Sequence, residues 1–331
     1  MGELHRVVVT DFIQDDLALE RQILGDLADV TALGAHGEDE LVGRIEQADA
    51  IILYHLICIT RRTIERLQRC KLIVRGGVGY DNIDRQFARE RGIPVANVPD
   101  YGSEEVADTA IAMTMTMVRG VHVLNSRLKI CQGPWSYLQV VPLVRLRGRG
   151  FGVVGLGRIG TAAALRAKAL GMSVLFYDPY KPDGYDKALG IRRVETLDEL
   201  LAQSLVVSMH CPLTDETRHM IDAAAIARMA RGSYLVNTAR GAVVDTAAVP
   251  DAIASGHLAG AAIDVLEVEP PPADDPLMRA WRDPQHPAHH RLILNPHSAF
   301  YSVEGLEDMR RRTAEACRLA ILGRPIRNVV N

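Results

Sequence analysis

A glycine-rich turn between an apolar run and a helix-forming stretch constrains this chain more than any other feature. Residues 151–154 form an apolar run of strand type, residues 155–160 read Gly-Leu-Gly-Arg-Ile-Gly, and residues 161–170 can form a helix. In that context the first glycine permits a tight turn, the second lets the backbone approach a pyrophosphate, and the third lets the helix pack on the strand. The helix amino terminus then faces the anion. The segment predicts a parallel α/β domain that binds a dinucleotide.

Asp178 indicates which dinucleotide. It ends the next expected strand, 18 residues beyond Gly160, where a carboxylate can accept hydrogen bonds from both ribose hydroxyls and would repel a 2′-phosphate. This position favours NAD as the cofactor. Lys181, close by, keeps NADP open, and a plain glycine turn beside a surface aspartate is the structural alternative.

Two successive alternations of apolar runs and amphipathic stretches predict two α/β units with parallel sheets. Strands are expected at 7–10, 50–54, 72–74 and 95–98 in the first unit, and at 151–154, 174–177, 205–209, 234–236, 260–264 and 292–294 in the second. Ser103, followed by two glutamates, is expected to open a long helix where the chain crosses between them. The helical pattern at 302–322 could return to pack on the first unit, which would then be discontinuous.

The sequence indicates where two helices begin. Thr60 is expected to cap a helix over 60–68. Pro250 requires that the helix expected within 245–255 either begins near Val249 or is kinked.

The composition of the chain excludes several broad classes of protein. The 331 residues suggest two domains, since a domain commonly has about 100–200 residues. The 38 Lys and Arg nearly balance the 41 Asp and Glu, so no net field attracts nucleic acid or an anionic membrane surface. No run approaches the ~18 apolar residues of a membrane span, and the first residues lack the pattern of a signal peptide. We therefore expect a cytoplasmic protein whose five cysteines, with no C-x-x-C pair, are reduced.

Three polar residues stand at the ends of expected strands or just beyond, where open α/β sheets bind their ligands: Arg240, Glu269 and His297. Reduction of a ketone by hydride needs a proton donor that titrates near neutrality, a fixed cation for the substrate, and a group that holds the donor. Histidine, arginine and glutamate suit those roles. Taken singly, each could equally be an ordinary loop or ion-paired residue.

Other polar clusters carry weaker interpretations. Residues 76–79, Gly-Gly-Val-Gly, could offer bare amides to a small carboxylate, with Arg75 beside them, or could be a simple turn. His286, His289 and His290 invite a metal site, but their proline-rich loop offers no regular spacing, so we expect no metal. Residues 310–312, three arginines among acids, are expected to be a solvated helix face.

The chain resembles the D-isomer-specific 2-hydroxyacid dehydrogenases over nearly its full length, and among them the C-terminal-binding-protein branch. The resemblance rests on VRGGVGYDNID at 74–84, ALRAKA at 164–169, LFYDPY at 175–180, NTARG at 237–241 and PHSAFYS at 296–302. It implies two Rossmann-like domains, one flavodoxin-like and one dinucleotide-binding, with the active site in the cleft between them and a homodimer formed through the NAD domains. The implied domains are a discontinuous substrate-binding domain at 1–101 and 299–331, and an NAD-binding domain at 102–298.

By position, the family's catalytic trio falls on Arg240, Glu269 and His297, with Glu269 orienting the histidine. Formate dehydrogenases, which pair their histidine with glutamine, are disfavoured. The implied cofactor contacts are Gly155, Leu156, Gly157, Arg158, Ile159, Gly160, Asp178, Cys211, Pro212, Thr217, Thr238, Ala239 and Asp264. The resemblance implies that Val78 and Gly79 offer amides to the substrate, and the further candidate substrate contacts are Arg75, Tyr101 and Phe300. Phe300 replaces a tryptophan of the C-terminal-binding branch, and Tyr101 replaces a small residue, so the acyl group accepted stays open.

The expected function is therefore NAD-dependent oxidoreduction of a small 2-oxoacid or 2-hydroxyacid, with no nucleic-acid or membrane partner. A corepressor-like dimeric protein that senses NAD(H) and retains only vestigial activity is the alternative from a different class, because fold and motif alone do not establish function. An oxidoreductase of the same fold acting on phosphite or an unusual acid would differ only in its pocket.

Overall fold

The computed structural model describes residues 4–331 and divides into two compact units. Unit 1 comprises Met1–Gly102 and Ser302–Asn331, and unit 2 comprises Ser103–Tyr301. The chain therefore crosses between units after residues 102 and 301, where the sequence suggested crossings after 101 and 298. Residues 1–3, which belong to the amino terminus considered for a leader, lie outside the described residues.

Unit 1 contains a five-stranded parallel sheet in the order β2-β1-β3-β4-β5. Its strands are β1 (His5–Val9), β2 (Ala28–Ala32), β3 (Ala50–Leu53), β4 (Leu72–Arg75) and β5 (Val95–Asn97). Its helices are α1 (Ala18–Leu24), α2 (Arg61–Ile64), α3 (Arg85–Glu90) and α12 (Val303–Ile321). The chain places β2 on one side of β1 and then β3 on the other side. The order of the strands therefore reverses between β1 and β3.

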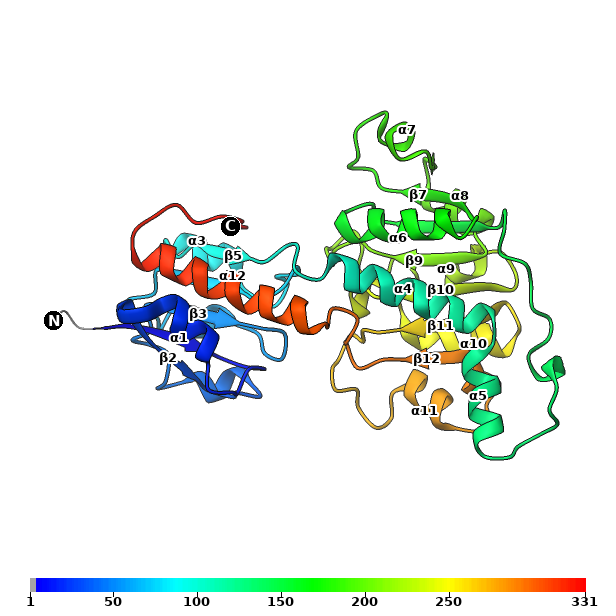
Figure 1. Ribbon diagram of the computed structural model, residues 1–331, viewed down its shortest axis with the longest axis horizontal. Coiled ribbons are helices and arrows are strands. Elements are labelled where there is room, and N and C mark those ends of the chain that lie inside the picture. Colours follow the sequence, from blue (N-terminus) through cyan, green and yellow to red (C-terminus); the bar gives the residue numbers. More distant parts are fainter. Residues whose placement is uncertain (1–3) are drawn as a thin grey trace. The chain divides into compact units, whose positions relative to one another are not determined.

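Helix α12 belongs to unit 1 although the chain reaches it last. It begins after Ser302, whose Oγ accepts a hydrogen bond from Gly305 N (2.8 Å), and it packs against α1, β3 and β4 (Figure 1). The expected return of the helical tail to the first unit is thus confirmed.

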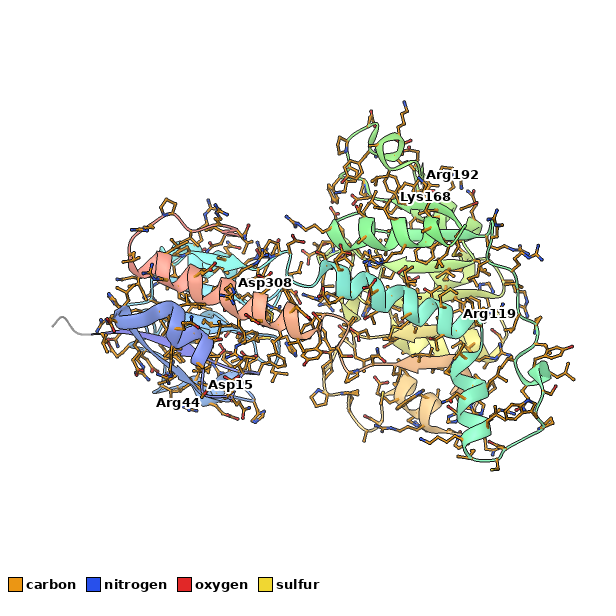
Figure 2. The ribbon with its side chains drawn as sticks, viewed as in Figure 1. Asp15, Arg44, Arg119, Lys168, Arg192 and Asp308 are labelled. Carbon is orange, nitrogen blue, oxygen red and sulfur yellow. The ribbon has the colours of Figure 1, made fainter. Side chains whose placement is uncertain are left out.

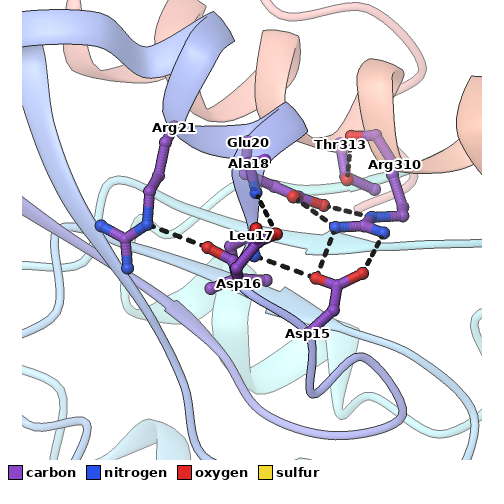
Figure 3. A network of polar contacts seen from close by, with 8 residues as sticks. All are labelled: Asp15, Asp16, Leu17, Ala18, Glu20, Arg21, Arg310 and Thr313. Carbon is purple, nitrogen blue, oxygen red and sulfur yellow. Dashed lines mark hydrogen bonds and ion pairs between the residues drawn. The ribbon is translucent and has the colours of Figure 1, made fainter.

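An arginine on α12 joins it to the start of the chain (Figure 3). Arg310 donates from Nε and Nη2 to the two carboxylate oxygens of Glu20, both at 2.7 Å, and from Nη1 and Nη2 to Asp15 at 2.6 and 2.9 Å. Glu20 is fully buried and the Arg310 side chain is 13% exposed. The expectation of a solvated arginine face is therefore wrong at Arg310, because a buried carboxylate needs a charged partner. Arg311 and Arg312 do lie at the surface, paired with acids one turn away.

Unit 2 contains a seven-stranded parallel sheet in the order β12-β11-β10-β9-β6-β7-β8. Its strands are β6 (Gly150–Val154), β7 (Ser173–Tyr177), β8 (Arg192–Arg193), β9 (Val206–Met209), β10 (Ser233–Asn237), β11 (Leu258–Ile263) and β12 (Leu292–Leu294). Its helices are α4 (Ser103–Val118), α5 (Val121–Lys129), α6 (Arg158–Ala169), α7 (Tyr185–Leu189), α8 (Leu197–Gln203), α9 (Ala223–Arg228), α10 (Val249–Ala254) and α11 (Pro276–Arg282). The strand order reverses between β6 and β9. Two parallel α/β sheets confirm the predicted fold class.

Neighbouring residues of β6 pack into different apolar clusters, because successive side chains of a strand point to opposite faces of the sheet. Phe151 and Val153 join the cluster that includes residues of α4 and α6, whereas Val154 joins the cluster that includes residues of α8–α11. Helix α10 begins at Val249, with Pro250 in its first turn, so the first of the two expected alternatives is correct.

Charged side chains lie at the surface of both units. Examples labelled in Figure 2 are Arg44 in unit 1, and Arg119, Lys168 and Arg192 in unit 2, all of them exposed. Within residues 4–331, no helix combines the length and apolar character needed to span a bilayer.

The helix expected at 60–68 is shorter in the structure than the sequence predicts. Only α2, of four residues, forms there, and Thr60 makes no side-chain cap. Its hydroxyl instead contacts the Glu38 carboxylate, with Oγ1–Oε1 at 2.9 Å, and Thr63 Oγ1 does the same at 2.6 Å. The distant carboxylate therefore replaces the local cap.

Candidate active site

The glycine turn follows β6 and opens α6. Gly155 has φ +88°, and a Cβ at that position would lie 2.7 Å from Cys211 N, so that β6 and β9 could not keep their loops this close with a side chain there. A Cβ at Gly160 would lie 2.1 Å from Gly155 O. At Gly157, by contrast, an added Cβ would meet no other atom of residues 4–331 within 4 Å, apart from the adjoining residues of the chain. The amino terminus of α6 thus has an open side that a phosphate can approach.

Asp178 follows β7, next to the glycine turn. Its Oδ2 accepts a hydrogen bond from Leu156 N at 2.8 Å, and its Oδ1 accepts one from Tyr180 N at 3.0 Å. A carboxylate has about four acceptor sites, so two backbone donors hold it in place and leave capacity for two ribose hydroxyls.

The loops after β9 and β10 bring the other implied cofactor contacts to the same edge. Thr238 is 7% exposed, and among the described residues its buried Oγ1 has no hydrogen-bond partner, which is what a missing ligand group would leave. Thr217 donates from Oγ1 to Pro212 O (2.7 Å) and so shapes its own loop. Together with the open glycine turn, the unpartnered Thr238 hydroxyl shows that these residues fit a dinucleotide.

His297 and Glu269 meet beyond β11 and β12. Nδ1 of His297 lies 2.7 Å from Oε2 of Glu269, while Oε1 of Glu269 accepts a hydrogen bond from Leu266 N (2.7 Å). His297 has φ 52°, in the left-handed region. Neighbouring parts of the loop must hold such a residue in place.

Asp264 holds that loop. Its backbone oxygen accepts from His297 N at 2.7 Å, and its carboxylate accepts from Ser298 N and Ala299 N at 3.0–3.2 Å. Burial raises the pKa of the Asp264 carboxyl above its usual range, and these two amides act in the opposite direction. The sequence interpretation gave Asp264 only a cofactor contact, and the structure adds the anchoring of His297.

Arg240 lies in the loop after β10. Asn237 shapes this loop, because its side chain donates to Arg240 O (2.9 Å) and accepts from Ala239 N (3.0 Å). The Arg240 guanidinium donates to Ala239 O at 2.8 Å. A Cβ at the following Gly241 would lie 1.9 Å from the carbonyl carbon of Leu266. The loops after β10 and β11 are therefore in contact, and the two strands are neighbours in the sheet.

His210 is a site residue that the sequence analysis did not single out. It directly follows β9, and its Nε2 lies 2.8 Å from Ser208 Oγ. A Cβ added at Gly160 would lie 3.3 Å from the Cβ of His210, so this residue is next to the glycine turn. Burial lowers the pKa of the His210 imidazole to about 4, so the ring is neutral at physiological pH. The sequence could have pointed to His210 only through its place at the end of an expected strand that lies beside the glycine turn.

The substrate contacts implied by the sequence divide between the units. In unit 2, the Phe300 ring stands edge-on to the His297 ring, with centroids 6.2 Å apart. In unit 1, Arg75 is buried at the end of β4 and donates to Gly76 O (2.8 Å), and Asn97 Nδ2 donates to Val78 O (2.6 Å). Gly79 and Tyr101 are half-buried.

Two aromatic residues of unit 1 that the sequence analysis did not consider lie where the strand order reverses. Phe12, with φ 64°, has its ring 4.8 Å from that of His55, and they follow β1 and β3, where the strand order reverses. Asp11 ties these loops by accepting from Tyr54 N and Leu56 N, both at 2.8 Å. Open α/β sheets commonly bind ligands where the strand order reverses. This rule was the only feature of the sequence that could have pointed to Phe12 and His55.

The histidines considered for a metal make other contacts. His289 Nδ1 lies 2.6 Å from Trp281 O, and His286 Nδ1 accepts from Ala288 N (3.1 Å). In the described part of the chain, no group of three or more His, Cys, Asp or Glu side chains is placed to hold a metal ion.

Residues 111–299 match the family model described as D-isomer specific 2-hydroxyacid dehydrogenase, NAD binding domain. This match covers more than half of the chain. The chain belongs to the D-isomer-specific 2-hydroxyacid dehydrogenase family. The expected resemblance and the expected cofactor, NAD, are thereby confirmed.

Individual relatives agree with the family. The chain is 33% identical to D-3-phosphoglycerate dehydrogenase of Methanocaldococcus jannaschii over 98% of its own length and 59% of that protein. It is 33% identical to C-terminal-binding protein 1 of Caenorhabditis elegans over 93% of its length and 42% of that protein. The chain thus spans about half the length of these curated relatives. D-lactate dehydrogenase from Aquifex aeolicus, solved with NAD and lactic acid, is 31% identical with a TM-score of 0.86, over 96% of each chain.

Proposed function

We propose that this chain is an NAD-dependent D-2-hydroxyacid dehydrogenase that interconverts a small 2-oxoacid and the corresponding 2-hydroxyacid. The observation that carries the proposal is the contact of 2.7 Å between His297 Nδ1 and Glu269 Oε2, in the unit whose glycine turn fits the cofactor. An imidazole held by a carboxylate is a proton donor and acceptor suited to neutral pH.

Each residue of the trio has a distinct role. His297, held at Nδ1 by Glu269, exchanges a proton with the substrate oxygen through Nε2. Glu269 fixes the orientation of the ring through its contact with Nδ1. Arg240 binds the substrate carboxylate and stabilises negative charge on the carbonyl oxygen as it develops. Bound NADH would supply the hydride for reduction.

The remaining candidate residues would bind the substrate or the cofactor and take no part in the chemical step. Arg75 and the amides of Val78 and Gly79 would bind the substrate carboxylate, and Tyr101 and Phe300 would contact its side chain. Residues 155–160, Asp178, Cys211, Pro212, Thr217, Thr238, Ala239 and Asp264 would hold the cofactor. Asp178 selects NAD over NADP, since its carboxylate would repel a 2′-phosphate.

A homodimer is part of the proposal, with an apolar segment of unit 2 as its support. Four large side chains after and at the end of α5 are strongly exposed: Ile130 (68%), Trp135 (90%), Tyr137 (69%) and Leu138 (63%). Large apolar side chains exposed within one short segment support an interaction surface there. Light scattering of the purified chain, with Trp135→Glu as the variant expected to shift the mass towards a monomer, tests it.

A second function follows from a specific similarity. The C-terminal-binding protein of C. elegans matches nearly the whole chain, which supports an NAD(H)-responsive interaction protein as the alternative. NADH-dependent assembly without turnover of any 2-oxoacid would favour this alternative over the dehydrogenase.

The deciding experiment follows NADH oxidation by the purified protein across 2-oxoacids from glyoxylate to phenylpyruvate and 4-methylthio-2-oxobutyrate. An Arg240→Ala variant is assayed beside it, and NADH binding to both is measured by fluorescence. Turnover above ~1 per second that is lost in the variant, with NADH binding retained, supports the dehydrogenase. A protein that binds NADH but reduces none of the acids contradicts it.

A further inference from the structure

One carboxylate outside the trio connects two loops of unit 2. Oε1 of Glu267 accepts a hydrogen bond from Arg218 Nη1 at 2.6 Å, and Oε2 lies 2.9 Å from His219 Nε2. Arg218 and His219 belong to the loop that follows β9, residues 210–220, which also contains the implied cofactor contacts Cys211, Pro212 and Thr217. Glu267 belongs to the loop that follows β11. The two strands are not neighbours in the sheet, because β10 lies between them.

Glu267 lies within the short segment that supports His297. At one end of this segment, the backbone of Asp264 accepts from His297 N; at the other, Glu269 reaches His297 Nδ1 and also accepts from Leu266 N. Residues 264–269, which we call the acid segment, therefore set where the histidine and its carboxylate lie.

The acid segment is held on two sides. The backbone at 266–267 lies so close over Gly241 that a Cβ there would be 2.3 Å from Glu267 N, so the loop after β10 fixes one side. The Glu267 side chain ties the segment to the loop after β9. That loop is itself fixed, since His219 N donates to Ala242 O at 2.7 Å, and His219 has φ 50°, a strained conformation that its surroundings must impose.

Contribution to global stability does not explain this arrangement. The side chains of Arg218, His219 and Glu267 are 42–52% exposed, and ion pairs between exposed side chains contribute little to the free energy of folding. Catalytic geometry is far more sensitive, because a displacement of ~1 Å can lower turnover about 100-fold. The hydrogen bonds from His219 and Arg218 also lower the pKa of the Glu267 carboxyl, which keeps it ionised and able to hold both partners.

We propose that Glu267 is a positioning residue: through Arg218 and His219 it holds the acid segment so that Glu269 stays against His297. The inference rests on the proposed function for its catalytic meaning. Its structural content concerns only the placement of residues 264–269 and can be tested without turnover.

The first test is hydrogen exchange on the cofactor-free protein. In Glu267→Gln, the amide of Leu266, which donates to Glu269, is expected to exchange at least several-fold faster than in the wild type. Asp198→Asn is the matched control, since it removes an ion pair with Arg228 of similar exposure (48% and 60%) in the same unit. Faster exchange at 264–269 in Glu267→Gln alone supports the proposal. Unchanged exchange there overturns it.

The second test asks whether Glu267 acts through Glu269. Glu267→Gln is expected to lower kcat about 10-fold with NADH affinity unchanged, and Glu267→Asp, which keeps the charge, is expected to recover part of the loss. In a Glu269→Gln background the same substitution is expected to have little further effect, because residues that act as a unit are not additive. Losses that multiply independently, or an Asp198→Asn variant that loses as much kcat, contradict the proposal. If the wild type reduces no 2-oxoacid, the proposed function fails, and the exchange experiment alone decides whether Glu267 holds the segment.

Discussion

Nδ1 of His297 lies 2.7 Å from Oε2 of Glu269, although 28 positions separate the two residues. The contact is possible because β11 and β12 are parallel neighbours, so the loops that follow them leave the same edge of the sheet.

Replacement of His297 by Ala should lower turnover about 100- to 10,000-fold, the usual contribution of a positioned acid or base. NADH binding should be unchanged, because the cofactor residues lie on other loops. Steady-state kinetics with the best 2-oxoacid and a fluorescence titration with NADH check both statements. A variant that kept the full rate would show that another group donates the proton.

Replacement of Asp178 by Ala should reduce the preference for NADH over NADPH. The variant loses both the acceptor for the ribose hydroxyls and the charge that repels a 2′-phosphate, so affinity for NADH falls while affinity for NADPH rises or stays constant. The measurement is the ratio of the two dissociation constants. An unchanged ratio would mean that Lys181 or another residue determines the choice.

Gly241→Ala should impair the site strongly, because the new methyl group would fall 1.9 Å from the backbone of Leu266 and displace the segment that carries Glu269. We expect kcat to fall about 100-fold. Gly37→Ala is the matched control: its φ is −163°, and apart from its chain neighbours no described residue has an atom within 4 Å of the added Cβ. Equal activity of both variants would argue against the close contact of the two loops.

His210 should make stability depend on pH. Burial lowers its pKa from the ordinary value of 6.5 to about 4 in the folded chain, so between these values the unfolded chain binds a proton that the folded chain does not. Stability is then fully present above pH 6.5 and falls with decreasing pH until about pH 4. At pH 5 the loss is roughly 2 kcal/mol. Urea unfolding at pH 7 and pH 5 should show a smaller drop for His210→Asn than for the wild type. The exposed His36→Asn should behave as the wild type does.

Arg310→Met should destabilise unit 1, because it leaves the fully buried carboxylate of Glu20 without its cation. Removal of one partner from a buried pair costs about 3–5 kcal/mol. The neighbouring Arg311→Met removes only an exposed pair with Glu307 and should change stability by less than about 0.5 kcal/mol. Urea midpoints of the two variants provide the comparison, and similar midpoints would contradict a structural role for Arg310.

Local sequence patterns predicted most of the fold. The buried strands β3 and β4 stand within one residue of their expected bounds, since parallel strands covered on both faces appear as continuous apolar runs. The strands β2 (ADVTA) and β8 (two arginines) were missed. β2 and β8 lie at the edges of their sheets, where polar side chains face solvent and no apolar run forms.

The site was only partly predictable. The glycine turn, Asp178 and the trio have local signatures or follow strand ends directly. The second role of Asp264, and the contacts of Glu267 and Arg310, depend on residues brought together from distant parts of the chain. No spacing rule within one segment encodes such contacts, so they required the structure.

The return of α12 to unit 1 has a consequence for biosynthesis. On the ribosome, all five strands of unit 1 emerge before unit 2, whereas the helix that packs on β3 and β4 emerges only after unit 2 is complete. Unit 2 is contiguous and can fold as it appears. The nascent first hundred residues must meanwhile wait with β3 and β4 uncovered where α12 will pack and with Glu20 lacking Arg310, which makes that interval the time when a chaperone matters most.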